Sequence, residues 1–97
     1  MLLVLDTDRE LYLFATQAET EAWLETIDVE NEEYDFCDDC GRRYTADVNL
    51  GAVQLIPQEI DVALPLTFWA SACHLAKSYN DIRTLDDLAA RLHANQT

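Results

Sequence analysis

Short apolar runs in the first half of the chain predict two hairpins. The runs Leu2–Leu5 and Leu11–Phe14 are separated by a few polar residues, which is typical of an antiparallel hairpin. Apolar residues then alternate with polar ones over 33–37 and again over 44–48. The intervening residues 38–41 carry Asp early and Gly late, as tight turns prefer, so we expect the second hairpin there.

A first helix is predicted between the two hairpins. Thr16 and Glu19 have the spacing of a capping box, in which the two residues satisfy free backbone donors at a helix start. The helical pattern continues to about Asp28. Its spacing places Trp23 on the buried stripe, with alanines beside it, and Glu21 on the solvent side.

Two further helices are expected in the last third of the chain. Pro65 suits a first helical turn, and apolar residues recur on two sides from Leu66 to Tyr79, which favours a central helix. Asn80 is suited to cap its C-terminus. A second pattern, beginning at Thr84, predicts the last helix.

The element order predicts the fold class. Residues 53–56 would add an edge strand that Pro57 ends, whereas 58–64 are compatible with strand, coil or a short helix. We therefore expect a single α+β domain over residues 1–97. Its antiparallel sheet consists of two hairpins in the order β-β-α-β-β, and the C-terminal helices pack on one face.

The net charge of the chain indicates which kinds of partner it can bind. Nineteen acidic residues against six Lys and Arg give a net charge of −13, while the 49% hydrophobic content distinguishes the chain from a disordered acidic tail. Binding to phosphates needs clusters of Lys and Arg, which are absent, so nucleic acid and anionic membranes are not expected as direct ligands. A basic protein is the natural complement.

The apolar runs and the cysteines indicate the cellular compartment of the protein. The apolar start of the chain stops at Asp6, too soon for a signal peptide, and no run is long enough to span a membrane. The three cysteines are an odd number, which favours reduced thiols over a disulfide framework. We therefore expect a cytoplasmic protein.

Most of the negative charge is concentrated in one segment. Residues 19–39, here called the acidic segment, contain ten acidic residues and no Lys or Arg. We expect them to form one surface that attracts a basic partner, although an acidic surface can also serve solubility alone. The residues expected to contact the partner are Glu21, Glu25, Asp28, Glu30, Glu32, Glu33, Asp35, Asp38 and Asp39.

Other candidate chemistry is weaker. Cys37 and Cys40, followed by Gly41, form half of a zinc-knuckle pattern. The remote pair Cys73 and His74 would project about 100° apart on a helix and would not converge on one metal. We therefore expect no cofactor, and a Cys37–Cys40 metal site stays an alternative.

The sequence gives no support for catalysis. Ser71 lies three residues before His74, the spacing at which a nucleophile and a base can meet on a helix, but no glycine-rich elbow surrounds it. Two glycines are too few for a phosphate-binding loop. The chain is expected not to be an enzyme.

The N-terminal half resembles a known class of proteins. The residues Leu11–Phe14, Glu19–Trp23 and the motif Ile-Asp-Val-Glu-Asn-x-Glu-Tyr at 27–34, followed by the Asp-x-x-Gly turn at 38–41, are similar to small bacterial immunity proteins encoded beside polymorphic toxins of the Rhs type. The similar part covers roughly residues 1–48. The two cysteines of the turn depart from the Asp-rich turn expected in this class.

The resemblance implies a function. Members of this class are small, acidic and non-enzymatic, and they neutralise a cognate toxin by capping or distorting its active site. Their interfaces diverge together with the toxins, so no functional residue carries over to this chain. The leading hypothesis is an immunity protein that binds a basic toxin domain through the acidic segment. The alternatives are a DNA-mimic inhibitor of a nucleic-acid-binding protein and a small zinc-binding module.

Overall fold

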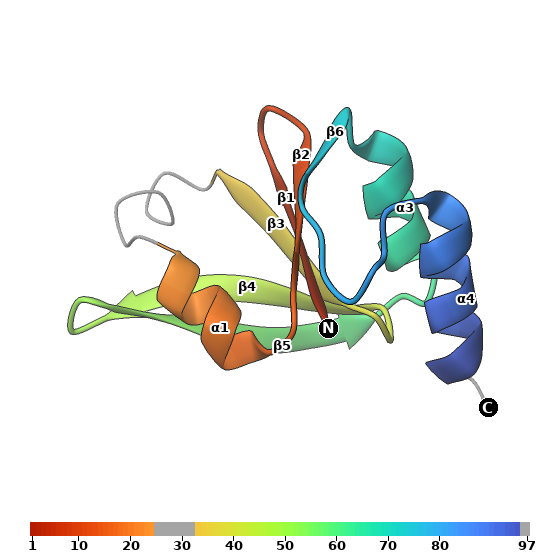
Figure 1. Cartoon of the computed structure of the whole chain (residues 1–97). Helices are drawn as coiled ribbons and strands as arrows, with labels where there is room; N and C mark the ends of the chain where they lie inside the picture. The colour runs from red at the N-terminus through yellow and green to blue at the C-terminus, as the bar shows by residue number, and fades with distance from the viewer. Residues whose placement is uncertain (25–32, 96–97) are drawn as a thin grey trace.

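Six strands and three helices form the part of the chain that this computed structural model describes, residues 1–24 and 33–95 (Figure 1). In chain order they are β1 (Leu2–Asp6), β2 (Glu10–Phe14), α1 (Gln17–Trp23), β3 (Tyr34–Asp38), β4 (Arg42–Asn49), β5 (Ala52–Ile60), α3 (Leu64–Ser71), β6 (His74–Lys77) and α4 (Leu85–Asn95). None of these helices has the length and apolar character needed to cross a bilayer.

The strands form one mixed sheet in the order β5-β4-β3-β1-β2-β6. Both predicted hairpins, β1–β2 and β3–β4, are present as antiparallel pairs. The α+β class is confirmed, but the expected all-antiparallel layout of two hairpins is not. Two additional strands flank the hairpins, and β6 pairs with β2 in parallel.

The predicted helix 66–79 is wrong beyond Ser71. After α3 the backbone becomes extended at Ala72, whose N–H donates to the carbonyls of Phe68 and Trp69, and residues 74–77 form β6. The pattern misled because a short strand also buries alternate residues. Leu75 and Lys77 are half-buried, whereas the residues between and before them are exposed.

Asn80 does not cap a helix but lies in a tight turn. Asn80 and Asp81 have φ values of 54° and 61°, and the N–H of Ile82 donates to the carbonyl of Tyr79. Two consecutive left-handed residues are the signature of a type I′ turn, in which Asn and Asp are tolerated.

Helix α1 begins as predicted and buries different residues. Thr16 accepts a hydrogen bond from the backbone N–H of Glu19 at 3.1 Å. The helix ends at Trp23, and its expected continuation to Asp28 falls outside the described residues. Thr20 is the buried helical residue, whereas the neighbouring alanines expected on the buried stripe are exposed.

The edge strand β5 is longer than predicted. It continues through Pro57 to Ile60, and the pairing with β4 is irregular between Arg42 and Tyr44. Pro57 does not end the strand because β5 has a neighbour on only one side, where a missing N–H can be tolerated.

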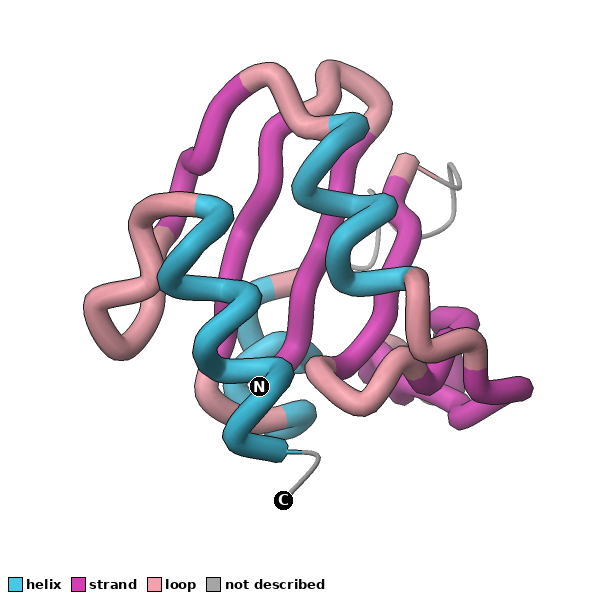
Figure 2. The backbone as a smooth tube through the Cα atoms, turned by 90° about the vertical axis from the view of Figure 1, so that its right-hand side faces the viewer, coloured by secondary structure: helices cyan, strands magenta, loops and turns pink. Residues whose placement is uncertain are grey.

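Two hydrophobic clusters lie on opposite faces of the sheet. On one face, Leu3, Leu11, Leu13 and Cys37 pack against α3 and α4, so the C-terminal helices share a face as expected (Figure 2). The other cluster joins the opposite side chains of the same strands to Leu24, after α1, and Leu55 of β5. The members of this second cluster are Leu2, Val4, Phe14, Leu24, Phe36 and Leu55.

Helix α1 protects the outer edge of β5. A carboxylate oxygen of Glu21 accepts from the N–H of Leu55 at 2.7 Å, and the Gln17 amide donates to the carbonyl of Leu55 at 3.0 Å. Leu55 is 1% exposed, so these groups are shielded from water. The two side chains thus replace a neighbouring strand at this point of the edge.

The turn between β3 and β4 is fixed to the segment before α3. Asp38 accepts from the N–H groups of Cys40 and Arg42, both at 2.9 Å. Gly41 has φ +88°, and its carbonyl accepts from the N–H of Asp61 at 2.8 Å. An added Cβ at Gly41 would overlap the Asp61 carbonyl, so this position requires glycine.

Substituting the two glycines should have unequal effects. Gly41→Ala should lower the free energy of unfolding by about 2–5 kcal/mol, because positive φ and overpacking both act there. Gly51→Ala is the matched control: its φ is +79°, but an added Cβ would meet nothing within 4 Å. It should lose only about 1–2 kcal/mol. Urea unfolding measures both, and equal losses would contradict the Gly41–Asp61 contact.

Removing the Glu21 carboxylate should weaken the β5 edge. Glu21→Ala should lower the free energy of unfolding by about 1–3 kcal/mol, because the N–H of Leu55 loses its acceptor. Glu21→Gln keeps an oxygen acceptor and should retain most of the stability. Glu59→Ala, at an exposed ion pair with Arg43, should cost under about 1 kcal/mol. A loss in Glu21→Ala no larger than in this control would rule out the edge contact.

Candidate protein-binding surface

An aromatic cluster lies on the face of the sheet that α1 covers. The Trp23 ring centroid is 4.7 Å from that of Tyr12, 5.1 Å from that of Phe14 and 5.8 Å from that of Tyr34. Phe36 adjoins Tyr34 at 6.1 Å. The two phenylalanines are buried, Tyr12 and Tyr34 are half-buried, and Trp23 is 36% exposed. The cluster therefore presents rings to solvent above a fixed apolar base.

Strand register places these rings together. Val4 of β1 pairs with Tyr12 on one side and with Phe36 on the other, so the three side chains form a row across the sheet. Asp6 pairs with Tyr34 in the same way and follows two residues after Val4. Since alternate residues of a strand share a face, Asp6 projects on the same face as the aromatic cluster.

Two carboxylates surround the Tyr12 hydroxyl. Its oxygen lies 2.9 Å from an oxygen of Glu10 and 3.3 Å from one of Asp6, and the second Asp6 oxygen accepts from the N–H of Glu10. Burial and then the hydrogen bond to Glu10 raise the pKa of Tyr12, with the charges of Asp6 and Glu10 acting in the same direction. The phenol therefore stays protonated and remains a donor at neutral pH.

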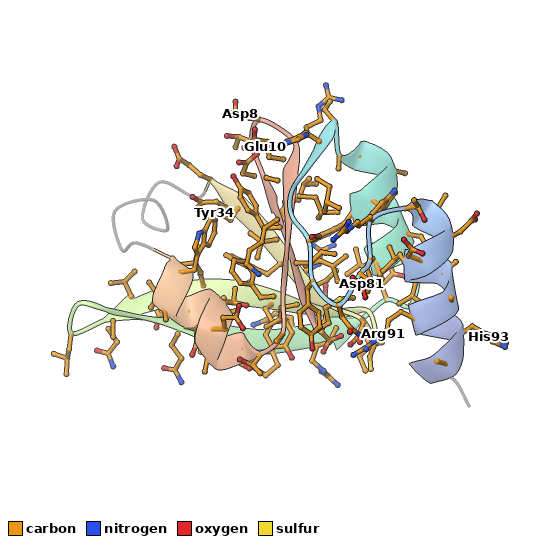
Figure 3. All side chains as sticks on the ribbon, in the orientation of Figure 1. Asp8, Glu10, Tyr34, Asp81, Arg91 and His93 are labelled. Atoms are coloured by element: carbon orange, nitrogen blue, oxygen red, sulfur yellow. The ribbon has the colours of Figure 1, made fainter. Side chains whose placement is uncertain are left out.

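These two carboxylates form no ion pair among the described residues, although Arg9 lies beside Glu10 in the β1–β2 turn. No Lys, Arg or N-terminal ammonium in that part of the chain lies within 4.0 Å of Asp6 or Glu10. The nearby cation Lys77 lies 4.6 Å from the Phe14 ring centroid and pairs with Glu19. The open end of β1, β2 and β3, where Figure 3 labels Asp8, Glu10 and Tyr34, thus carries aromatic rings and three carboxylates (Asp6, Asp8 and Glu10), with Arg9 as the one cation of the β1–β2 turn.

Two members of the acidic segment adjoin Tyr34 in the chain, but Asp35 pairs with Leu5 and therefore projects from the other face of the sheet. Glu33 and Asp35 flank Tyr34, the former half-buried and the latter exposed. Four further predicted contact residues, Glu25, Asp28, Glu30 and Glu32, lie outside the described residues.

Three predicted contact residues are engaged inside the molecule. Glu21 holds the β5 edge, and Asp38 holds the β3–β4 turn and accepts from the Tyr44 hydroxyl at 3.2 Å. Asp39 lies 3.6 Å from the N-terminal ammonium and 3.3 Å from Arg91. Asp38 ends β3 and Asp39 follows it, at the opposite end of the strand from Tyr34, so the described part of the acidic segment is divided between two places.

Sequence reasoning missed two contributors to this surface. Asp6 and Glu10 precede the acidic segment and were treated only as polar residues of the first hairpin. Their spacing around the hairpin turn, with Tyr12 next in the alternation, is the signal that could have found them. Trp23 was placed on a buried stripe, although more than a third of its surface is exposed.

The structure does not favour the alternative of a Cys37–Cys40 metal site. Cys37 is buried in the cluster beneath α3 and α4, whereas Cys40 is exposed at the turn, so a shared metal would require that cluster to open. Burial raises the pKa of Cys37, and the neighbouring Asp38 raises it further. Atoms of Asp38, Asp39 and Cys40 lie within 4.8 Å of one another, but both carboxylates already have internal partners.

The possible Ser71–His74 pair loses its helical geometry. Ser71 ends α3, and His74 begins β6. The two residues are therefore not one turn apart on a helix, and the spacing that suggested a nucleophile and a base no longer applies.

No protein-family model, curated protein or solved structure matches this chain. The resemblance of the N-terminal half to immunity proteins therefore stays a prediction. What supports a function is the local chemistry of the surface itself.

Thiol reactivity should divide the cysteines into two classes. Cys40 and Cys73 are exposed and should react rapidly with a disulfide reagent such as DTNB, whereas Cys37 is buried and should react at least about a hundredfold more slowly. The variant with Cys40→Ser and Cys73→Ser isolates the third thiol. Its release of chromophore should begin only as urea unfolds the protein, and rapid reaction without urea would contradict the burial.

Proposed function

We propose that this chain is a cytoplasmic immunity protein, which binds a basic toxin domain and neutralises it by covering its active site. The observation that carries the proposal is the partly exposed aromatic cluster bordered by Asp6 and Glu10, which form no ion pair among the described residues. The resemblance of residues 1–48 to small immunity proteins is consistent with it. The chemistry of each part of this surface favours a protein partner with Lys or Arg at its centre.

The aromatic cluster supplies the kind of group that anchors protein interfaces. Trp and Tyr are enriched among residues whose truncation costs more than about 2 kcal/mol of binding free energy. Trp23 is held by three neighbouring rings, so little side-chain freedom is lost when a partner covers it. A guanidinium can also stack on such rings while it pairs with an adjacent carboxylate.

The carboxylates supply selectivity and speed. Asp6 and Glu10 border the cluster, and Asp35 is exposed on β3. None of the three has a Lys or Arg ion-pair partner in the described chain, so a partner's cation would not have to displace an internal one. A net charge of −13 also steers a basic protein toward the surface before contact. A toxin domain that itself binds an anionic substrate would carry the complementary charge at its active site.

Association should depend on charge at β3 and not on charge in general. Surface plasmon resonance measures the rate at which the chain binds the product of a neighbouring toxin gene. Asp35→Lys should lower the association rate constant at least about threefold, whereas Asp47→Lys, an exposed aspartate of β4, should have little effect. The triple variant Glu30→Lys, Glu32→Lys and Glu33→Lys should lower it at least about tenfold with an unchanged melting temperature.

Two further measurements vary the salt concentration and add DNA as a competitor. Raising the salt from about 50 mM to about 500 mM should slow association of the wild type at least about tenfold. Unchanged kinetics in the triple variant would remove the acidic segment from the proposal. Competition by DNA, together with binding to unrelated DNA-binding proteins, would instead favour the DNA-mimic alternative.

A further inference from the structure

A second surface lies on the opposite side of the molecule, between α3 and α4 (Figure 2). It is a groove of about 390 Å³ whose walls are mostly apolar. Val62 and Leu66 line one wall, and Ala89 and Leu92 line the other. The β3–β4 turn and the last turn of α4 close it with Asp39, Cys40 and His93.

Leu92 packs against the core, but the apolar side chains of the opposite wall of this groove largely do not. Val62 is 73% exposed and Leu66 is 42% exposed, whereas Phe68 and Leu88 of the same two helices are buried against the sheet. Leu85, four residues before Ala89 and therefore on the same side of α4, is 50% exposed. Exposed apolar residues gathered in one groove, rather than scattered singly, indicate an interaction site.

The charges around the groove indicate which kind of segment can bind in it. Residues 44–76 contain no Lys or Arg, and Asp61 lies exposed beside Val62. Asp86 lies exposed beside Leu85, and Arg91 is already engaged with Asp39. The uncompensated charge beside the apolar walls is therefore negative.

The same charge disfavours a second copy of this chain. Each copy would bring a net charge of −13 toward the other, and such self-repulsion opposes association. A segment with an apolar ridge and positive flanks satisfies both features of the groove, since the ridge covers Val62 and Leu66 while the flanks approach Asp61 and Asp86.

We propose that the α3–α4 groove binds an amphipathic helix of a partner protein, with leucine-like side chains on its ridge and Lys or Arg on its flanks. Helix-in-groove recognition uses apolar anchors at i, i+3 or i+4 and i+7. The helices that form the groove pack on the face of the sheet opposite the aromatic cluster. The site is therefore separate from the surface proposed for toxin binding and does not depend on that function.

The experiment uses a synthetic peptide of about 14 residues with leucines at helical anchor spacing and lysines elsewhere. Fluorescence anisotropy gives its dissociation constant, and amide chemical shifts give its location on the full chain. The double variant Val62→Ser and Leu66→Gln should weaken binding at least about tenfold, and the largest shifts should fall on α3 and α4. Both residues are exposed, so the double variant should fold normally.

Matched controls isolate the groove. Leu50→Gln removes an equally apolar side chain that is 99% exposed between β4 and β5, and it should leave binding unchanged. A peptide with glutamate in place of lysine should bind at least about tenfold more weakly than the lysine peptide.

Three results would overturn the proposal. Equal affinity of the wild type and the double variant would exclude the groove. Shifts centred on Trp23 would place the peptide on the aromatic cluster instead. A dimer in sedimentation velocity that the double variant abolishes would show that the groove pairs two copies of this chain.

Discussion

The double burial of β1 is the constraint on which the rest of the structure depends. Leu3 packs toward α3 and α4, while Leu2 and Val4 pack toward the opposite cluster, and none of the three is more than 3% exposed. A strand that is apolar on both faces must be covered twice. The C-terminal helices supply one cover, and α1 with the β4–β5 hairpin supplies the other. The groove between α3 and α4 belongs to the first cover, and the aromatic cluster lies on the opposite sheet face beside α1.

The local sequence pattern was enough to predict the hairpins, but it failed where a strand pairs with a segment far away in the sequence. The turn at Gly41 and the cap at Thr16 are determined by neighbours within four residues, and both appear as the sequence predicts. Strand β6 instead pairs with β2 from about sixty residues away. Nothing within the segment itself distinguishes a buried helix from a strand whose side chains Leu75 and Lys77 alternate inward. The long helix was therefore a wrong prediction of a kind that only tertiary pairing could correct.

The candidate surface was predictable in charge but not in detail. The sequence places ten carboxylates between Glu19 and Asp39, yet it does not show which of them internal donors engage to hold the fold. The N–H of Leu55 engages Glu21, and the N-terminal ammonium and Arg91 engage Asp39. These donors come from distant parts of the chain. Asp6 was missed in part for the converse reason, because the register of β1 and β3 brings it beside Tyr34.

Charge without an ion-pair partner distinguishes the proposed binding surface from the carboxylates that hold the fold. Like charges around the Tyr12 hydroxyl oppose each other, and a neutral chain in the same fold would avoid that repulsion. Other acidic residues offset their cost by holding an edge, a turn or the chain terminus. Asp6 and Glu10 have only the hydroxyl and one backbone N–H between them, and Asp35 on the next strand has no ion pair within the described chain. A cation from a partner would relieve this repulsion and cover the rings in one step. Binding would thus offset the cost of placing these carboxylates together.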